Sequence, residues 1–597
     1  MRRLATLLVL ALAVGAGLPV AAAPPAWAPR PATYEVVQQR DARITMSDGV
    51  RLRADVYFPG KGGKPAGGRF PVVLTQTPYN KAAPELNFHS AYLVQRGYIQ
   101  VVADVRGTGG SEGMWDSFGS REQRDGAELV RWAATQPWSD GRVALHGTSY
   151  GAINQIFTAA QQPTGLKAIF PVVPMADSYR DISITGGQNN TSFIPLWLGL
   201  VTGGGLAPST AAAQDPVAAA TTVGQHAANV AHFPVPVVAN STTGGDISYD
   251  GPFHRQRSPI EVVDRVNVPT FLVGGWYDLF QRGTPMLYER LSKRVPTRLL
   301  MGPWYHITAG EGLPADGVRS LDELELRWFD HHVRGVADPE LDREAPVTYY
   351  RLGEGHYHRT ATWPPADAVA TTVHLSGHAQ QGAPGGLSMT APTTDATSPV
   401  PWHPFGGLCS RSPAQWTASG QDAGCKDDQR ANELAGVAFE LPSASQSRTL
   451  AGPIAAALSV STNGRDAMLV VRVEDVAPDG AITQITAGWQ VLSLNKLTAA
   501  RDTMMRNGKV LRPWHPFTRA SQSIPADGEV RQVWVEVFPT AAVVAAGHRL
   551  RVSIQPSDTP HLTAPAPQAA GLAGSVLTIH TGPRHPSFLN IAFTPSG

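Results

Sequence analysis

The first 345 residues repeat one pattern, in which a short apolar run is followed by a segment with helical spacing. In segments such as Gln123–Ala134, apolar residues recur every three or four positions, as expected for a helix. Strands that alternate with helices predict a parallel sheet covered on both faces. The apolar runs are Phe70–Leu74, Tyr98–Val105, Val143–His146, Leu166–Val173, Thr270–Val273 and Thr297–Met301, and a hairpin over Ile44–Phe58 precedes them. We therefore predict an α/β domain.

This α/β pattern is interrupted once and then ends. Residues 177–265 are rich in Gly, Thr and Ala without strand rhythm, and we interpret them as a partly helical cap inserted between residues 35–176 and 266–345 of the α/β domain. From about residue 346 to residue 597 the runs are short, β-rich and separated by Pro, Gly and Asp, which predicts a β-sandwich. These runs are Val347–Arg351, Val369–Leu375, Met468–Val473, Ile482–Thr486, Val530–Val537 and Leu550–Ile554.

Residues 1–23 have the order of a secretory signal peptide. Arg2 and Arg3 precede an apolar run and then small alanines. A membrane anchor is the alternative, but the run is short and interrupted by Gly and Pro. We therefore expect a secreted protein without membrane attachment after cleavage.

The two cysteines predict a disulfide. Cys409 and Cys425 lie 16 positions apart in a loop rich in Gly, Ser and Asp. An isolated pair in an exported chain is typical of one bridge. Two unrelated free thiols are the alternative interpretation.

The charge balance argues against a nucleic-acid partner. Lys and Arg total 49 and Asp and Glu total 48, for a formal net charge of +1. Proteins dedicated to nucleic acids normally carry a basic excess or stripe. We expect a small-molecule ester or amide, or a short peptide, as the partner.

The segment Gly147–Gly151 matches the pattern G-x-S-x-G around Ser149. It follows the predicted strand Val143–His146 and precedes a helical pattern over Ala152–Ala160. A tight turn from strand to helix lifts a serine hydroxyl above the sheet, at the positive end of the helix. This context predicts Ser149 as a nucleophile rather than a structural serine.

Serine needs an adjacent imidazole, which is itself held by a carboxylate. In α/β-hydrolases these residues follow the serine in the order acid and then histidine, each just past a strand end. Asp278 follows Phe271–Val273 and His306 follows Leu299–Met301, so both occupy the required positions. We therefore predict a Ser149, Asp278 and His306 triad.

The oxyanion of a tetrahedral intermediate needs hydrogen-bond donors directed at it. The backbone N–H of Tyr150, directly after the nucleophile, is one expected donor. The other should come from the loop after Phe70–Leu74, where the Tyr79 hydroxyl is the candidate. The alternative for Tyr79 is simple packing.

Five motifs stand in order along the chain: TPYNK (Thr77–Lys81), DVRGTGGSEG (Asp104–Gly113), QPWSDGRVALHGTSYG (Gln136–Gly151), GGWYD (Gly274–Asp278) and GPWYH (Gly302–His306). Together they resemble the CocE/NonD serine hydrolases, a family that includes cocaine esterase, α-amino-acid ester hydrolases and Xaa-Pro dipeptidyl-peptidases. The resemblance implies an α/β-hydrolase domain with a helical cap and a C-terminal jelly roll of galactose-binding-like type. It also implies the Ser149, Asp278 and His306 triad, with Tyr79 in the oxyanion hole.

The resemblance implies no cofactor, and we expect no metal. His331 and His332 are adjacent at the end of a predicted helix, which is not the spacing of a shared ligand face.

The residues around the acid indicate the acyl group. A pocket for a free α-amine needs buried carboxylates, and Asp177 and Asp181 are the nearest candidates in the cap. Asp278 is instead followed by Leu279 and Phe280. We expect an apolar, aromatic pocket, with Trp276, Tyr277, Phe280 and Trp304 as its candidate lining residues and Phe193 and Trp197 as further ones.

Three functional hypotheses remain open at this point. The first is an exported esterase or amidase for neutral or aromatic acyl groups, working through an acyl-enzyme. The second is an Xaa-Pro dipeptidyl-peptidase. The third is a glycan-binding protein whose hydrolase domain is inactive, which the intact triad disfavours.

Overall fold

The computed structural model describes residues 27–83, 89–207, 209–421, 424–500 and 502–595. The predicted signal peptide over residues 1–23 lies outside the described residues. Within the described ranges, no helix combines the length and apolarity needed to cross a membrane.

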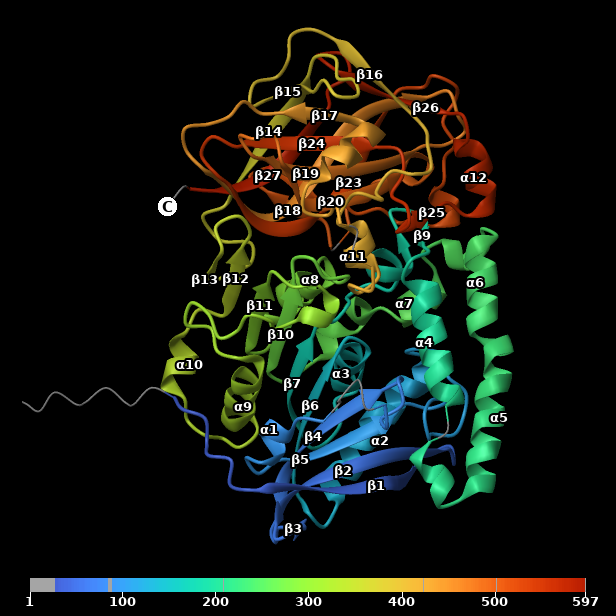
Figure 1. Cartoon of the computed structure of the whole chain (residues 1–597), viewed down its shortest axis with the longest axis vertical. Helices are drawn as coiled ribbons and strands as arrows, with labels where there is room; N and C mark the ends of the chain where they lie inside the picture. The colour runs from blue at the N-terminus through green and yellow to red at the C-terminus, as the bar shows by residue number, and fades with distance from the viewer. Residues whose placement is uncertain (1–26, 84–88, 208, 422–423, 501, 596–597) are drawn as a thin grey trace, which may run out of the picture.

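The N-terminal domain is built on one large sheet with the order β1-β2-β5-β4-β6-β7-β10-β11-β12-β13 (Figure 1). The strands from β5 to β12 run parallel, which confirms the predicted α/β architecture. The predicted hairpin is also present, with Ile44 paired to Leu52. The strands are β1 (Glu35–Thr45), β2 (Arg51–Lys61), β4 (Phe70–Thr77), β5 (Ile99–Asp104), β6 (Ser139–Thr148), β7 (Leu166–Val172), β10 (Thr270–Gly275) and β11 (Thr297–Gly302).

Both faces of this sheet are buried. Val72 and Leu145 pack on the side covered by α2 (Ser120–Thr135), α3 (Tyr150–Ala160) and α8 (Gly283–Leu291). Val73 and Ala144 pack on the opposite side, covered by α1 (Ala91–Val94) and α9 (Leu321–His332). Successive residues of a strand point to opposite faces, so continuous apolar runs are the expected sequence of these strands.

The predicted boundary at residue 346 is wrong, because β12 (Val347–Arg351) belongs to the first sheet. It pairs in parallel with β11, and β13 (His356–Thr360) continues the sheet antiparallel to it. The strand buries Val347 against the edge of the sheet. The change in sequence pattern near Arg334-Gly335 marks the end of α9, whereas the sheet continues to Thr360.

Residues 177–265 form the predominantly helical insert that the sequence predicts. Its helices are α4 (Ile194–Leu206), α5 (Pro216–His232), α6 (Pro234–Thr242) and α7 (Pro252–Gln256), which lie on one flank of the molecule (Figure 1). The insert also contacts the C-terminal domain, because β9 (Gln188–Asn190) pairs with β25 (Leu562–Thr563). The cap is therefore held by both domains.

The C-terminal domain is a β-sandwich whose strand path closes on itself. The order runs β18-β23-β20-β19-β24-β17-β15-β14-β27, and β27 returns to pair with β18. Three of these strands are β15 (Gly385–Ser388), β17 (Val437–Glu440) and β27 (Phe588–Thr594). Five predicted runs are found as β14 (Val369–Ser376), β19 (Met468–Val476), β20 (Ile482–Val491), β23 (Arg531–Val544) and β24 (Arg549–Gln555). The central strand β18 (Arg448–Thr462) was not predicted, because its alanines lack β-branching.

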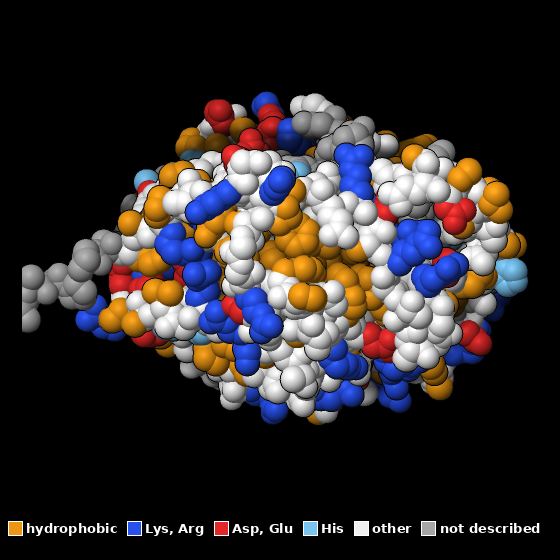
Figure 2. All heavy atoms as spheres, turned by 90° about the horizontal axis from the view of Figure 1, so that it is seen from below, with side chains coloured by type: hydrophobic (Ala, Val, Ile, Leu, Met, Phe, Trp, Pro, Cys, Tyr) orange, Lys and Arg blue, Asp and Glu red, His pale blue; other side chains and the backbone are white. Residues whose placement is uncertain are grey.

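One face of the molecule carries its basic side chains in scattered groups. Figure 2 shows this face, where Lys and Arg lie in separate groups and Asp and Glu are sparse. Hydrophobic side chains gather in a hollow at the centre of this face. The basic side chains form no continuous stripe on the part of the chain that this view draws in colour.

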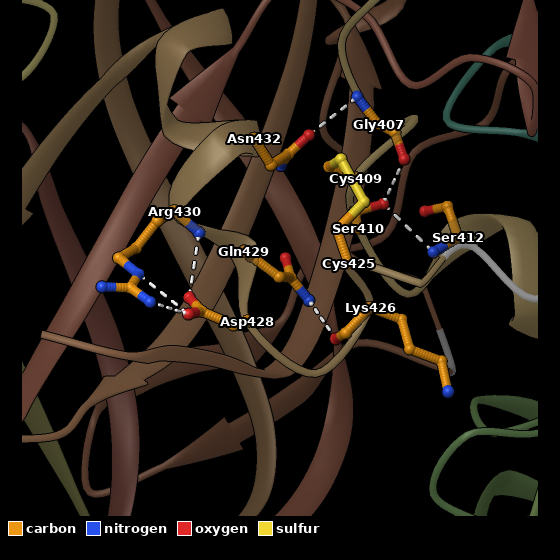
Figure 3. Close-up of a disulfide and its surroundings, with 10 residues drawn as sticks. All are labelled: Gly407, Cys409, Ser410, Ser412, Cys425, Lys426, Asp428, Gln429, Arg430 and Asn432. Carbon is orange, nitrogen blue, oxygen red and sulfur yellow. Dashed lines mark hydrogen bonds and ion pairs between the residues drawn. A yellow bond between two sulfur atoms is a disulfide. The ribbon is translucent and has the colours of Figure 1, made fainter.

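The predicted disulfide is confirmed. Cys409 and Cys425 are bonded, with their Cα atoms 5.1 Å apart (Figure 3). The loop after Cys409 is ordered locally, since the Ser410 hydroxyl donates to the Gly407 carbonyl at 2.7 Å and accepts from the Ser412 backbone N–H at 3.1 Å. This loop leads into the short helix α11 (Ser412–Trp416), which lies between the two domains (Figure 1).

Replacing both cysteines by serine should lower the melting temperature. Removing a bridge across a loop of this length costs about 3 kcal/mol on the chain-entropy model. Thermal unfolding of the double variant beside the wild type measures the change. A thiol assay on denatured, unreduced wild type is the control, and two free thiols there would contradict the bridge.

Candidate active site

Ser149 occupies a strained turn between β6 and α3. Its backbone has φ 57° and ψ −118°, a left-handed conformation that is uncommon for residues other than glycine. The turn needs glycine on both sides: a Cβ at Gly147 would lie 3.2 Å from Gly151, and one at Gly151 would lie 3.1 Å from the Gln76 carbonyl. The fold therefore holds the Ser149 hydroxyl at the carboxyl edge of the sheet.

His306 and Asp278 meet Ser149 at this edge. The Nε2 atom of His306 lies 2.8 Å from the Ser149 hydroxyl, and its Nδ1 atom lies 2.5 Å from Oδ2 of Asp278. The other oxygen of Asp278 accepts from the Phe280 backbone N–H at 2.6 Å. Asp278 is fully buried, so its carboxylate interacts with fixed donors instead of water. The three residues predicted from sequence thus form one hydrogen-bonded chain.

Tyr79 directs its hydroxyl toward Ser149, with which it interacts. The Trp197 indole N–H, from cap helix α4, donates to the Tyr79 oxygen at 3.2 Å. Burial raises the pKa of Tyr79 to about 12, so the phenol keeps its proton at neutral pH. Because Trp197 already donates to this oxygen, the Tyr79 hydroxyl has its own proton to donate to a different acceptor, and its role in the oxyanion hole stays a prediction.

Tyr150 begins α3, so its backbone N–H belongs to the first turn, where helical N–H groups have no intrahelical acceptor. Its role as the second oxyanion donor stays a prediction.

An apolar inner pocket opens beside Ser149 beneath the cap. Residues of α3, the cap and the acid loop line it, among them Phe118, Tyr150, Ile153, Phe193, Trp197 and Phe280. Its internal volume is about 100 Å³. None of its lining residues among those described is Asp or Glu.

Only one of the four aromatic residues first expected in the pocket lies there. Phe280 lines the inner pocket, whereas Trp276, Tyr277 and Trp304 line neither cavity at Ser149. Trp276 and Trp304 are buried in the core with their indole N–H groups bonded to backbone carbonyls, and Tyr277 packs under the Arg411 guanidinium. Trp276 belongs to the core cluster that contains Leu287, and Trp304 belongs to the core cluster that contains Trp328.

A second, wider cleft reaches Ser149 from the other side. Its volume is about 700 Å³, and His306, Trp197, Leu196, Leu200 and Ile307 are among its lining residues. This size suits a drug-sized ligand. The arrangement gives the serine a narrow apolar pocket on one side and a wide entrance on the other.

A buried carboxyl behind the inner pocket was missed from sequence. Glu122 of α2 accepts hydrogen bonds from the Tyr150 hydroxyl at 2.8 and 2.9 Å and from the Asn154 side chain at 3.1 Å. Burial raises its pKa to about 8. Nothing in the local helical pattern distinguishes this glutamate from an exposed one, so only the packing identifies it.

Glu122→Gln should change how stability depends on pH. Between its ordinary pKa of 4.5 and about 8, the unfolded chain has lost a proton that folded Glu122 retains, so rising pH destabilises the wild type through this group. The variant has no titrating group at this position and avoids that loss. Its free energy of unfolding relative to wild type should therefore rise by on the order of a few kcal/mol from pH 5 to pH 8. Denaturant unfolding at several pH values measures this. A constant difference across the range would contradict the buried neutral carboxyl.

Two family models match consecutive parts of the chain. Residues 48–308 match the X-Pro dipeptidyl-peptidase (S15 family) model, which spans the triad and the cap. Residues 339–590 match the X-Pro dipeptidyl-peptidase C-terminal non-catalytic domain. The first segment lies within the α/β domain with its cap, and the second covers most of the C-terminal domain together with β12 and β13 of the first sheet.

Curated relatives are similar over nearly the whole chain. A Mycobacterium tuberculosis protein named as a serine esterase is 26% identical, covering 88% of this chain and 92% of that protein. The cocaine esterase of Rhodococcus sp. is 25% identical, covering 92% and 96%.

Solved structures share the fold. A CocE/NonD family hydrolase from Staphylococcus aureus has a TM-score of 0.71 at 19% identity and covers 94% of each chain. An α-amino acid ester hydrolase has a TM-score of 0.70 at 20% identity, covering 97% of this chain and all of that one. The matched domains and the esterase relatives place this chain among the CocE/NonD and S15 serine hydrolases, and the solved structures share its fold.

Proposed function

We propose that this serine hydrolase cleaves esters or amides of compact, neutral and apolar acyl groups, including aromatic ones. The observation that carries the proposal is the inner pocket, which is lined mainly by apolar and aromatic side chains and has no carboxylate among its described lining residues. The Arg257 guanidinium also lines it and donates to the backbone carbonyls of Phe253 and Asp116. The pocket volume of about 100 Å³ is of the order that accepts a single ring, since a cavity of roughly 150 Å³ binds benzene. A glycan-binding protein without activity finds no support in the family membership.

The ion pairs of two cap carboxylates support a substrate with a neutral acyl group over one with a free α-amine. Asp177 forms an ion pair with Arg180 at 2.8 Å, and Asp181 forms one with Arg282 at 2.8 Å. Both carboxylates are buried and neither lines the pocket. Engaging either carboxylate with a substrate amine would require breaking a buried ion pair, which is costly. This argues against dipeptidyl-peptidase activity.

The geometry supports an acyl-enzyme mechanism. The Ser149 oxygen attacks the substrate carbonyl while His306 Nε2 takes the Ser149 proton. Asp278 holds the imidazole through Nδ1 and stabilises its charged form. Tyr79 donates to the oxyanion, and the imidazolium then protonates the leaving alcohol or amine, which departs through the wide cleft. Water, activated by His306, releases the acid in the second half of the reaction.

We further propose that the protein acts outside the cytoplasm. The order of residues 1–23 supports export. The Cys409–Cys425 bridge adds independent support, because disulfides persist in oxidising compartments.

A substrate comparison tests the acyl-group proposal. p-Nitrophenyl benzoate and p-nitrophenyl propionate should be hydrolysed with a higher kcat/KM than Ala-Pro p-nitroanilide, because the pocket has no carboxylate for an α-amine. Ser149→Ala is the control and should lose both the activity and labelling by a fluorophosphonate probe. Preferential release from Ala-Pro p-nitroanilide would overturn the proposal in favour of a dipeptidyl-peptidase.

Tyr79→Phe tests the oxyanion role. Removing one donor should lower kcat by roughly 10²–10³ with little change in KM, because the hydrogen bond strengthens as the oxyanion forms. Steady-state kinetics on the preferred ester measure this. Tyr288→Phe removes the hydroxyl of a buried tyrosine that lines neither cavity at Ser149, and should leave kcat unchanged. An unchanged kcat in Tyr79→Phe would mean that Tyr79 only packs.

A further inference from the structure

The loop that carries Asp278 contacts the C-terminal domain directly. Helix α11 of that domain lies against the loop, between the two domains (Figure 1). The Gln415 side-chain amide donates to the Asp278 backbone carbonyl at 3.0 Å and to Oε1 of Gln281 at 3.1 Å. Gln415 is only 4% exposed, so water does not readily replace either bond.

Two further residues of the same loop are held by the C-terminal sheet. The Gln281 amide donates to the Thr486 hydroxyl at 3.2 Å on β20 and to the Pro539 carbonyl at 2.8 Å on β23. The Arg282 guanidinium pairs with Glu536 of β23 at 2.7 Å. Both side chains are nearly fully buried. Both ends of the segment from Asp278 to Arg282 therefore bond to the C-terminal domain.

Helix α11 is itself a rigid support. Trp416, next to Gln415, is fully buried and stacks on the His561 ring with centroids 3.8 Å apart. The Ser412 hydroxyl, at the start of the helix, donates to Asp558 at 2.8 Å. The Cys409–Cys425 bridge closes the segment that contains the helix. The position of the Gln415 amide is therefore determined by the core of the C-terminal domain.

We propose that the C-terminal domain sets the position of the catalytic acid, with Gln415 as the positioning residue. A carboxylate orients an imidazole only while its own backbone is fixed, and small displacements of catalytic groups are costly. Gln415 fixes the carbonyl of the same residue whose carboxylate bonds His306. The domain described in its family model as non-catalytic is thereby part of the triad's support. This inference rests on the proposed role of Asp278.

Gln415→Met tests the inference, because methionine keeps the length of the side chain and removes both donors. We expect kcat for an ester substrate to fall about 10-fold with KM within twofold of wild type. The rate of fluorophosphonate labelling of Ser149 should fall by the same factor, since it depends on the triad and requires no ester turnover. Titration of active sites normalises both rates to folded enzyme. Wild-type rates in this variant would overturn the proposal.

A matched control separates positioning from general damage to the domain. Gln490→Met makes the same change at a glutamine of β20 that is 1% exposed and whose amide, among the described residues, donates to carbonyls of its own domain, those of Val491 and Leu494. It should leave kcat and the labelling rate unchanged. If Gln415→Met does not fold, Gln415→Asn takes its place: it withdraws the amide from the Asp278 carbonyl by one methylene and should lower kcat relative to wild type with KM within twofold. Wild-type kcat in that variant would overturn the proposal. Equal losses in the Gln490 control would overturn the specific role of Gln415.

The Asp278→Ala background shows whether Gln415 acts through the acid. Asp278→Ala alone should slow labelling of Ser149 strongly, and adding Gln415→Met should slow it less than twofold further. Residues that act as a unit show such non-additivity. A full additional 10-fold loss would overturn action through Asp278. Wild-type labelling in Asp278→Ala alone would instead overturn the triad, so the two failures are distinguishable.

Discussion

The hydrogen bond between His306 and Asp278 is the interaction on which the site depends. It requires that β10 and β11 end at the same edge of a parallel sheet, so that the turns after them meet above Ser149 on β6. It also requires a buried, fixed carboxylate, since a mobile one would pair with water instead. The first requirement is satisfied by the α/β domain alone, and the second involves the C-terminal domain as well.

Buried ion pairs hold the cap and the two domains together, and they lie outside the inner pocket beside Ser149. The buried carboxylates of the cap and interface include several that pair with arginines, such as Asp181 and Glu536 with Arg282. Paired charges of this kind fix the relative position of elements, and they are not available to a ligand without breaking the pair. The inner pocket beside Ser149 has no carboxylate among its described lining residues. Under the proposed function, substrate selection depends mainly on shape and on the absence of a partner for a substrate amine.

The parts of the fold set by local pattern were predictable, and those set by long-range packing were not. Continuous apolar runs predicted the strands of the parallel sheet, and G-x-S-x-G with its flanking elements predicted the turn at Ser149. The domain boundary was wrong because β12 has the same composition as a sandwich strand and is assigned only by its pairing with β11. Trp276 and Trp304 were wrong as pocket residues because adjacency to Asp278 or His306 in sequence does not decide which side of a turn they occupy.

The sequence by itself determined the order of the chemical groups: a serine in a strained turn, then an acid and a histidine, each after a strand. Local backbone preferences and hydrophobic periodicity are sufficient for that. Tertiary structure decided which partners surround those groups, because contacts such as Glu122 with Tyr150, Trp197 with Tyr79 and Gln415 with Asp278 join residues 28 to 137 positions apart. No local pattern encodes such pairs, which form only when whole elements pack and exclude water.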